Sequence, residues 1–176
     1  RCQSGGERGV VGVERVGGLE GGVRATLTAA EVCAADVREN GPGANIPGFL
    51  QREAKRMDKA VSGLKNGEGK PLKAGTTMVG VYCRGNEMNW VSVGDSRIYV
   101  IRGGQIAAQT RDHNYRLLLK EQLAAGQITR NFYETEEKTP QAEALTSFLG
   151  MNGLRRLDVN RTRNGNLQGA RTLLPE

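Results

Sequence analysis

Several residue types are scarce in this chain, and each scarcity excludes a class of protein. His113 is the only histidine among 176 residues, so a zinc site built from several histidines is excluded. The three cysteines are an odd number without a close pair, which fits neither a disulfide framework nor a Cys-x-x-Cys metal site. We expect Cys33 and Cys83 to be small buried apolar residues.

Long apolar runs are also lacking. No stretch of about 18 apolar residues occurs, so we expect no transmembrane helix and no membrane partner. The first eight residues lack the apolar centre of a secretory signal, which favours a cytoplasmic location. With 38% hydrophobic and 25% charged residues, the composition is ordinary for a globular protein, and the length favours one domain.

Positive charge exceeds negative charge, and the formal net charge is +6. Cationic residues are scattered except toward the C-terminus, where acids are few beside Arg155, Arg156, Arg161, Arg163 and Arg171. Surfaces that bind single-stranded nucleic acid interleave aromatic side chains with such charges. Because aromatics are absent there, a solvated basic face is favoured, and a nucleic-acid-binding domain ranks last among the functional hypotheses.

Apolar periodicity predicts three helices. One spans residues 23–37, with apolar residues at helical spacing on one face: Val23, Leu27, Ala30, Ala34 and Val37. A second helix is expected from about Ile46 to Leu64. A third follows Asn114 and ends near Ala125, with Gly126 as its C-cap.

Runs of β-branched and aromatic residues predict strands. A short strand is expected at residues 10–13, and residues 154–160 are compatible with another. Between them, four consecutive runs predict an antiparallel meander: 76–83, 88–93, 97–102 and 105–109. Two helices, a meander and a further helix indicate an α+β layered domain. We expect a surface excursion over residues 127–143 and a poorly ordered tail over 161–176.

One carboxylate stands at a turn in this meander. Valines alternate before Gly94-Asp95-Ser96 and β-branched residues follow it, so the chain should reverse there. A solvated carboxylate held on such a turn suits a hard divalent cation. Asp95 is therefore a candidate metal ligand. Alternatively, its side chain accepts backbone hydrogen bonds within the turn.

The motifs around Asp95 follow one another in a specific order: Gly75-Thr76-Thr77, Val93-Gly94-Asp95-Ser96-Arg97-Ile98-Tyr99, Gly103-Gly104-Gln105-Ile106 and Thr110-Arg111-Asp112-His113-Asn114. This order resembles the middle of a metal-dependent protein phosphatase of the 2C type, in its bacterial form. Residues 144–150 and the glycine-rich residues 17–22 also resemble segments of that family. The resemblance implies a layered α-β-β-α sandwich in which residues 1–160 form an incomplete domain, with the opening and closing strands missing.

The resemblance implies metal-binding roles for three residues. Glu14 falls on the position of the first metal-binding aspartate of the family, unless it is merely a solvated residue at a strand end. Arg15 falls on the following glycine, whose backbone carbonyl would contact a metal. Asp95 falls on the position that contacts a third, more weakly held ion. The implied cofactors are two to three Mn²⁺ or Mg²⁺ ions in the complete domain. Arg97 and His113 are expected to be structural.

Two functional hypotheses follow from the resemblance. In the first, a metal-activated water hydrolyses phosphoserine and phosphothreonine in phosphoprotein substrates of a serine/threonine kinase pathway. In the second, the chain is a catalytically inactive pseudophosphatase that acts as a binding or regulatory module, because Arg15 replaces a residue without a side chain. The sequence does not indicate an oligomeric state.

Overall fold

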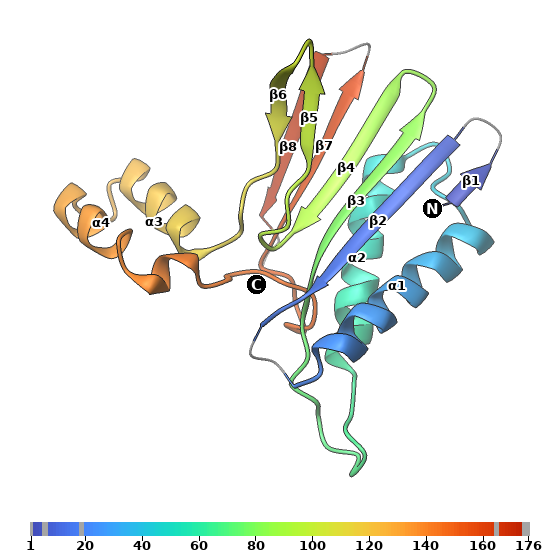
Figure 1. The fold of residues 1–176 in the computed structure, drawn as a ribbon, viewed down its shortest axis with the longest axis horizontal. Helices are drawn as coiled ribbons and strands as arrows, with labels where there is room; N and C mark the ends of the chain where they lie inside the picture. Colours follow the sequence, from blue (N-terminus) through green and yellow to red (C-terminus); the bar gives the residue numbers. More distant parts are fainter. Residues whose placement is uncertain (1, 5–6, 18–19, 164–165, 174–176) are drawn as a thin grey trace.

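The structure is a computed structural model that describes residues 2–4, 7–17, 20–163 and 166–173. Six strands form the main antiparallel sheet in the order β1-β2-β3-β4-β7-β8, and β5 and β6 pair separately (Figure 1). The strands are β1 (Cys2–Ser4), β2 (Glu7–Arg15), β3 (Thr76–Arg84), β4 (Glu87–Val93), β5 (Tyr99–Arg102), β6 (Gln105–Gln109), β7 (Arg156–Arg163) and β8 (Asn166–Leu173). The α+β class predicted from the sequence is confirmed.

The predicted four-strand meander is wrong in one respect, because β4 does not pair with β5. One edge of β4 pairs with β3 and the other with β7, from Glu87 opposite Arg163 to Ser92 opposite Asp158. A strand has only two edges, so β5 and β6 are left to form a two-stranded sheet of their own. The chain turns at residues 94–96 as predicted, but there it leaves the main sheet.

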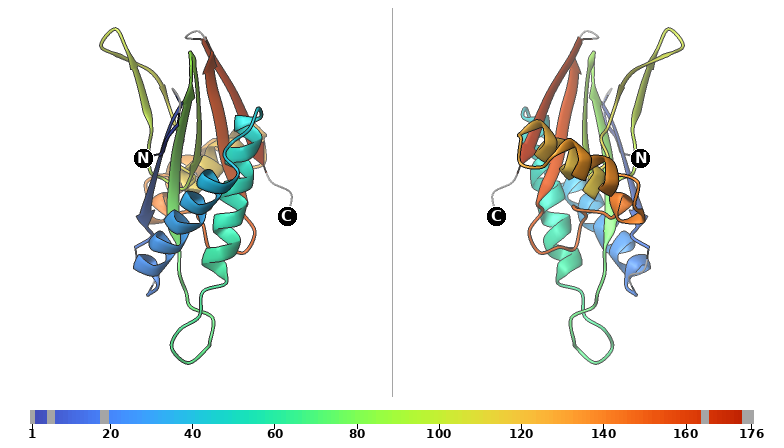
Figure 2. Two further views of the ribbon diagram at one scale, coloured as in Figure 1. Left: turned by 90° about the vertical axis from the view of Figure 1, so that its right-hand side faces the viewer. Right: turned by 90° about the vertical axis from the view of Figure 1, so that its left-hand side faces the viewer.

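Two helices cover one face of the main sheet (Figures 1 and 2). They are α1 (Gly22–Glu39) and α2 (Ile46–Ser62), as the periodicity predicted. The Asn45 side chain caps α2 by accepting a 3.0 Å hydrogen bond from the Gly48 N–H, and Pro47 stands in the first turn. The predicted apolar stripe of α2 is buried, including Phe49, Leu50, Ala54, Met57 and Val61.

The apolar face predicted for α1 is buried only in part, because Val37 packs against the core while the face's N-terminal residues do not. Val23 and Leu27 are 60% and 57% exposed, whereas the buried side is made of small residues: Ala25, Ala29 and Cys33. Small side chains allow the helix to pack closely on β2 and α2, which decides its rotation more strongly than the larger apolar residues do. Cys33 is buried as expected, but Cys83 is only half-buried.

The core lies between these helices and the sheet, and a buried carboxylate fastens a loop to it. Sheet residues that pack against the helices include Met78, Val91, Val93 and Leu157. Asp58 on α2 accepts hydrogen bonds of 2.7, 3.0 and 2.8 Å from the N–H groups of Gly150, Met151 and Gly153. The loop that leads into β7 is therefore held against α2.

A helical segment lies away from the main sheet (Figure 1). It contains the predicted third helix, α3 (Tyr115–Ala124), followed by α4 (Arg130–Glu136) and the short 3-10 helix η1 (Pro140–Glu143). The sequence indicated only an irregular excursion for the last two. The missed signal is Thr129, whose hydroxyl caps α4 by accepting a 3.2 Å hydrogen bond from the Phe132 N–H.

The C-terminal region differs from the expected tail. Strand β7 runs through residue 160 without a break and pairs with β8 over eight residues, from Arg156 opposite Leu173 to Arg163 opposite Asn166. Backbone hydrogen bonds make this hairpin, so it needs no apolar run that sequence patterning could detect. Residues 164–165 and 174–176 of the expected tail lie outside the described part of the chain. No helix in the described residues is both long and apolar enough to span a bilayer.

Candidate metal centre

The candidate ligand Glu14 lies next to the turn that carries Asp95. Glu14 stands near the end of β2, opposite Thr77 on β3. The Ser96 hydroxyl lies 3.2 Å from Glu14 Oε2 and 2.6 Å from Thr77 Oγ1. Since Ser96 has one hydroxyl proton and donates it to the carboxylate, Thr77 is the donor to Ser96. A chain of hydroxyls thus orients the Glu14 side chain from the neighbouring turn.

The turn itself requires glycine at position 94. Gly94 has a φ of +101°, and a Cβ atom there would lie 2.6 Å from Thr77 Cγ2. His113 clamps this residue from both sides, because the Gly94 N–H donates to His113 Nδ1 at 3.2 Å and the His113 N–H donates to the Gly94 carbonyl at 2.9 Å. Both hydrogen bonds hold the Gly94 backbone, one through the His113 ring and one through the His113 N–H, which supports a structural role for His113.

A buried ion pair stands behind His113. Nδ1 of the ring accepts the hydrogen bond from Gly94, and Nε2 on its other side faces Asp158 Oδ2 at 3.6 Å. Arg111 binds the same carboxylate in a bidentate manner, with distances of 3.0 and 2.8 Å. Burial acts to raise the pKa of Asp158, but His113 and Arg111 outweigh it and hold that pKa below its usual value.

Sequence reasoning missed Asp158 altogether. Its only signal was an acidic residue between Leu157 and Val159, inside a stretch compatible with a strand. The structure buries Asp158 on β7, where only 3% of its surface is exposed. Its partners His113 and Arg111 are 45 and 47 residues away in the sequence. Only the pairing of β4 with β7 brings Asp158 to the back of the Gly94 turn.

The Asp95 carboxylate is open to solvent. In the described part of the chain it makes no hydrogen bond and no ion pair, so the alternative role as a turn former has no support there. Its neighbour Arg97 is engaged instead with Asp112, with 2.7 Å from Nε to Oδ1. Hydrogen bonds with Asp112 and Tyr99 raise the pKa of Arg97, so this guanidinium stays charged in its structural pair.

The side chain of Arg15 lies on the other face of the sheet from Glu14. Successive residues of a strand point to opposite faces, and a Cβ atom added to Gly22 at the start of α1 would lie 3.1 Å from the Arg15 Cβ atom. The bulky cation therefore faces the helices and does not crowd the Glu14 carboxylate. The Glu14 backbone is fixed as well, because its carbonyl accepts a 2.8 Å hydrogen bond from Thr76 Oγ1.

The described residues contain two side chains that are candidate metal ligands. Glu14 and Asp95 offer hard carboxylate oxygens of the kind that Mn²⁺ and Mg²⁺ prefer. No three histidine, cysteine, aspartate or glutamate side chains in the described residues are grouped closely enough to hold an ion together. These two carboxylates fit such ions in chemical kind, but they are too few to hold two of them.

Comparison with known proteins decides the family. The family model described as protein phosphatase 2C matches residues 26–118, which is more than half of the chain. The chain belongs to the protein phosphatase 2C family. This match includes Thr76, Thr77, Asp95, Ser96 and His113, and it ends before β7. The family suggested by the order of motifs is therefore confirmed.

Solved structures show that the phosphatase 2C fold extends beyond that match. The serine/threonine phosphatase of S. agalactiae has a TM-score of 0.69 at 23% identity, over 89% of this chain and 63% of that one. Stp1 from Staphylococcus aureus has a TM-score of 0.66 at 24% identity, over 92% of this chain and 62% of that one. The catalytic domain of serine/threonine phosphatase PstP was solved with two manganese ions. It has a TM-score of 0.58 at 20% identity, over 89% of this chain and 73% of that one.

The chain spans less than two thirds of the length of the S. agalactiae and S. aureus proteins. A comparison with curated protein sequences gave no match. The layered fold and its incompleteness relative to these structures are shown, whereas the metal-binding roles of Glu14, Arg15 and Asp95 stay predictions.

Proposed function

We propose that this chain forms one side of the metal centre of a serine/threonine phosphoprotein phosphatase that uses Mn²⁺ or Mg²⁺. The observation that supports it is the Ser96 bridge, which joins Glu14 on β2 to the turn that presents the Asp95 carboxylate. Bound divalent ions in such a centre lower the pKa of a water molecule and offset charge on the phosphoryl oxygens. Glu14 and Asp95 would hold ions, and Ser96 would orient Glu14.

The substrates proposed are phosphoserine and phosphothreonine side chains of proteins in a kinase pathway, in the cytoplasm.

Nucleic acid is not proposed as a partner. Part of the basic C-terminal region is neutralised, since Arg156 donates a 2.7 Å hydrogen bond to Glu121. Arg155 in that region is exposed, as expected for a solvated basic face.

A pseudophosphatase is the second candidate. Glu14 and Arg15 replace the aspartate and glycine that the family resemblance implies, and the described carboxylates are too few for two ions. The position of the Arg15 side chain on the helix face weakens this argument, because the substitution leaves the Glu14 side uncrowded. The two candidates differ in whether the protein holds the metal ions that turnover requires.

Titration calorimetry with Mn²⁺, combined with hydrolysis of para-nitrophenyl phosphate and a phosphothreonine peptide, tests the proposal. We expect Mn²⁺ binding that falls at least tenfold in Glu14→Gln and in Asp95→Asn. Glu31→Gln, on the exposed side of α1, is the matched control and should bind Mn²⁺ as the unmodified chain does. Absence of both Mn²⁺ binding and turnover supports the pseudophosphatase, whereas Mn²⁺ binding that neither variant changes contradicts the proposed roles of Glu14 and Asp95.

A further inference from the structure

The solvent-facing side of α2 carries a row of four exposed cations, the basic row: Arg52, Lys55, Arg56 and Lys59. Their spacing of three and four residues places neighbouring side chains on one face of the helix. The basic row lies on the side of the main sheet that α1 and α2 cover (Figure 2). Because Glu14 faces the other side of the sheet, the basic row is separate from the candidate metal centre.

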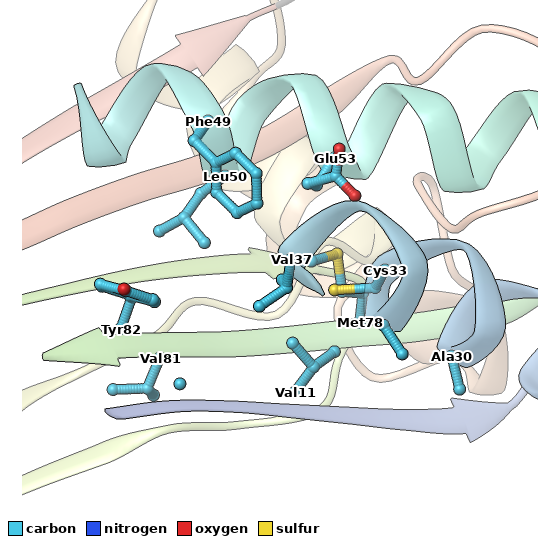
Figure 3. A pocket seen from close by; sticks show the side chains of 12 residues that line it. Val11, Ala30, Cys33, Val37, Phe49, Leu50, Glu53, Met78, Val81 and Tyr82 are labelled. Atoms are coloured by element: carbon cyan, nitrogen blue, oxygen red, sulfur yellow. The ribbon is translucent and has the colours of Figure 1, made fainter. Parts of the chain in front are cut away.

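The two acidic residues of α2 lie away from the basic row. Both are buried, since Glu53 is 1% and Asp58 is 4% exposed. Glu53 lies between α2 and α1 (Figure 3), where the Arg56 guanidinium is 3.4 Å from its carboxylate and also pairs with Asp36 of α1. Asp58 is occupied by the N–H groups of the loop that leads into β7. Only Arg56 of the basic row is therefore neutralised by these carboxylates.

The other three cations have no ion-pair partner in the described part of the chain: Arg52, Lys55 and Lys59. Like charges three or four residues apart on a helix repel one another, so the basic row destabilises α2. On α1 the exposed charges are mixed in sign: Arg24, Glu31, Arg38 and Glu39. A local conflict of charge that is kept on an exposed surface is typical of a functional site. The charges of α2 are thus available for a contact outside the chain.

Positive charge continues beside α2. Asp58 fastens the loop that leads into β7 to this helix, and the exposed Arg155 stands in that loop. Residues 144–157 contain no acidic residue. An anionic partner lying along α2 and this loop would therefore meet no exposed carboxylate of these two segments.

We propose that the basic row binds an acidic segment of a partner protein. Guanidinium groups bind carboxylates in a bidentate manner, and Arg52 and Arg56 are one helical turn apart. The row extends over about 10 Å, since an α-helix rises about 1.5 Å per residue. About four residues of an extended chain cover that length, and alternate side chains of such a chain point the same way. A segment with glutamate or aspartate at alternate positions would therefore present its carboxylates to the row.

Other anionic partners fit this surface less well. No aromatic residue is exposed on α2, so nucleic-acid bases would have no ring on which to stack. The large apolar side chains that are exposed in the described residues lie on other elements, so α2 offers no group that would enter a bilayer. Carboxylates of a polypeptide need neither contact.

Fluorescence anisotropy of the full chain with a labelled peptide, in which glutamate alternates with serine, tests this interaction. We expect weak, saturable binding at about 50 mM salt that is lost at about 300 mM, because exposed ion pairs are screened. The same peptide with glutamine in place of glutamate should not bind. Arg52→Gln/Lys55→Gln should weaken binding of the glutamate peptide about tenfold, the loss expected for two exposed ion pairs.

A matched double variant separates the basic row from the net charge of the chain. Lys120→Gln/Arg130→Gln removes one lysine and one arginine from α3 and α4, away from α2 (Figure 1). It should change the affinity by less than about twofold. Thermal melts should show Arg52→Gln/Lys55→Gln to be folded and slightly more stable than the unmodified chain, because repulsion within α2 is relieved.

Three outcomes would overturn the proposal. The first is no binding of the glutamate peptide to the unmodified chain. The second is an equal loss of affinity in the two double variants, because net charge alone would then explain the binding. The third is stronger binding of an oligodeoxynucleotide of equal charge, or of phosphatidylserine vesicles, that Arg52→Gln/Lys55→Gln abolishes, because the basic row would then serve another class of partner.

Discussion

The Ser96 hydroxyl donates a 3.2 Å hydrogen bond to the Glu14 carboxylate across 82 positions of sequence. If Glu14 binds a metal ion, Ser96→Ala should weaken Mn²⁺ binding about tenfold, because a ligand without its orienting partner must be ordered by the ion itself. Titration calorimetry measures this. Ser62→Ala is the control, since that hydroxyl bonds only the Lys59 carbonyl of its own helix. Equal affinities in Ser96→Ala and the unmodified chain would remove Glu14 from the metal centre.

Gly94→Ala should destabilise the chain by about 2 kcal/mol. The added methyl group meets Thr77 at 2.6 Å, and the φ of +101° disfavours any side chain. Urea denaturation measures the change in the free energy of unfolding. Gly67→Ala is the matched control, because it has no atom within 4 Å of its Cβ position and should change stability by less than about 0.5 kcal/mol. Similar effects of the two substitutions would contradict the tight packing of the turn.

Asp158→Asn should destabilise the chain by about 3 kcal/mol, because it leaves Arg111 without its buried bidentate partner. Since the pKa of Asp158 is lowered on folding, its stabilising contribution is present above about pH 3.8, the unfolded value. It is lost as the pH falls through the still lower folded pKa. Denaturation between pH 2.5 and 7 checks both points. Glu68→Gln, in the exposed pair with Lys70, should have almost no effect.

Glu53→Gln should remove a pH dependence near neutrality. Folding raises the pKa of this carboxyl from 4.5 to about 7. Its stabilising contribution is therefore complete below pH 4.5 and is lost as the pH rises through 7. The free energy of unfolding should fall by about 2 kcal/mol between pH 5 and pH 8 in the unmodified chain and by less in the variant. Parallel curves for the two proteins would contradict the shift.

The order of motifs from Gly75 to Asn114 was sufficient to predict the phosphatase 2C family, and local patterning found α1, α2 and α3. These features are encoded locally: helical periodicity, an Asn cap before α2, and glycine where the turn at position 94 needs a positive φ. The same information placed Asp95 on a turn open to solvent.

Long-range pairing decided the rest. Local patterning gives no information on which strand occupies a given edge, so the pairing of β4 with β7 and the burial of Asp158 behind His113 could not be predicted. The rotation of α1 was decided by close packing of Ala25, Ala29 and Cys33, against the larger residues Val23 and Leu27. In both cases the deciding free energy comes from contacts between residues far apart in the chain, which exist only once the sheet has formed.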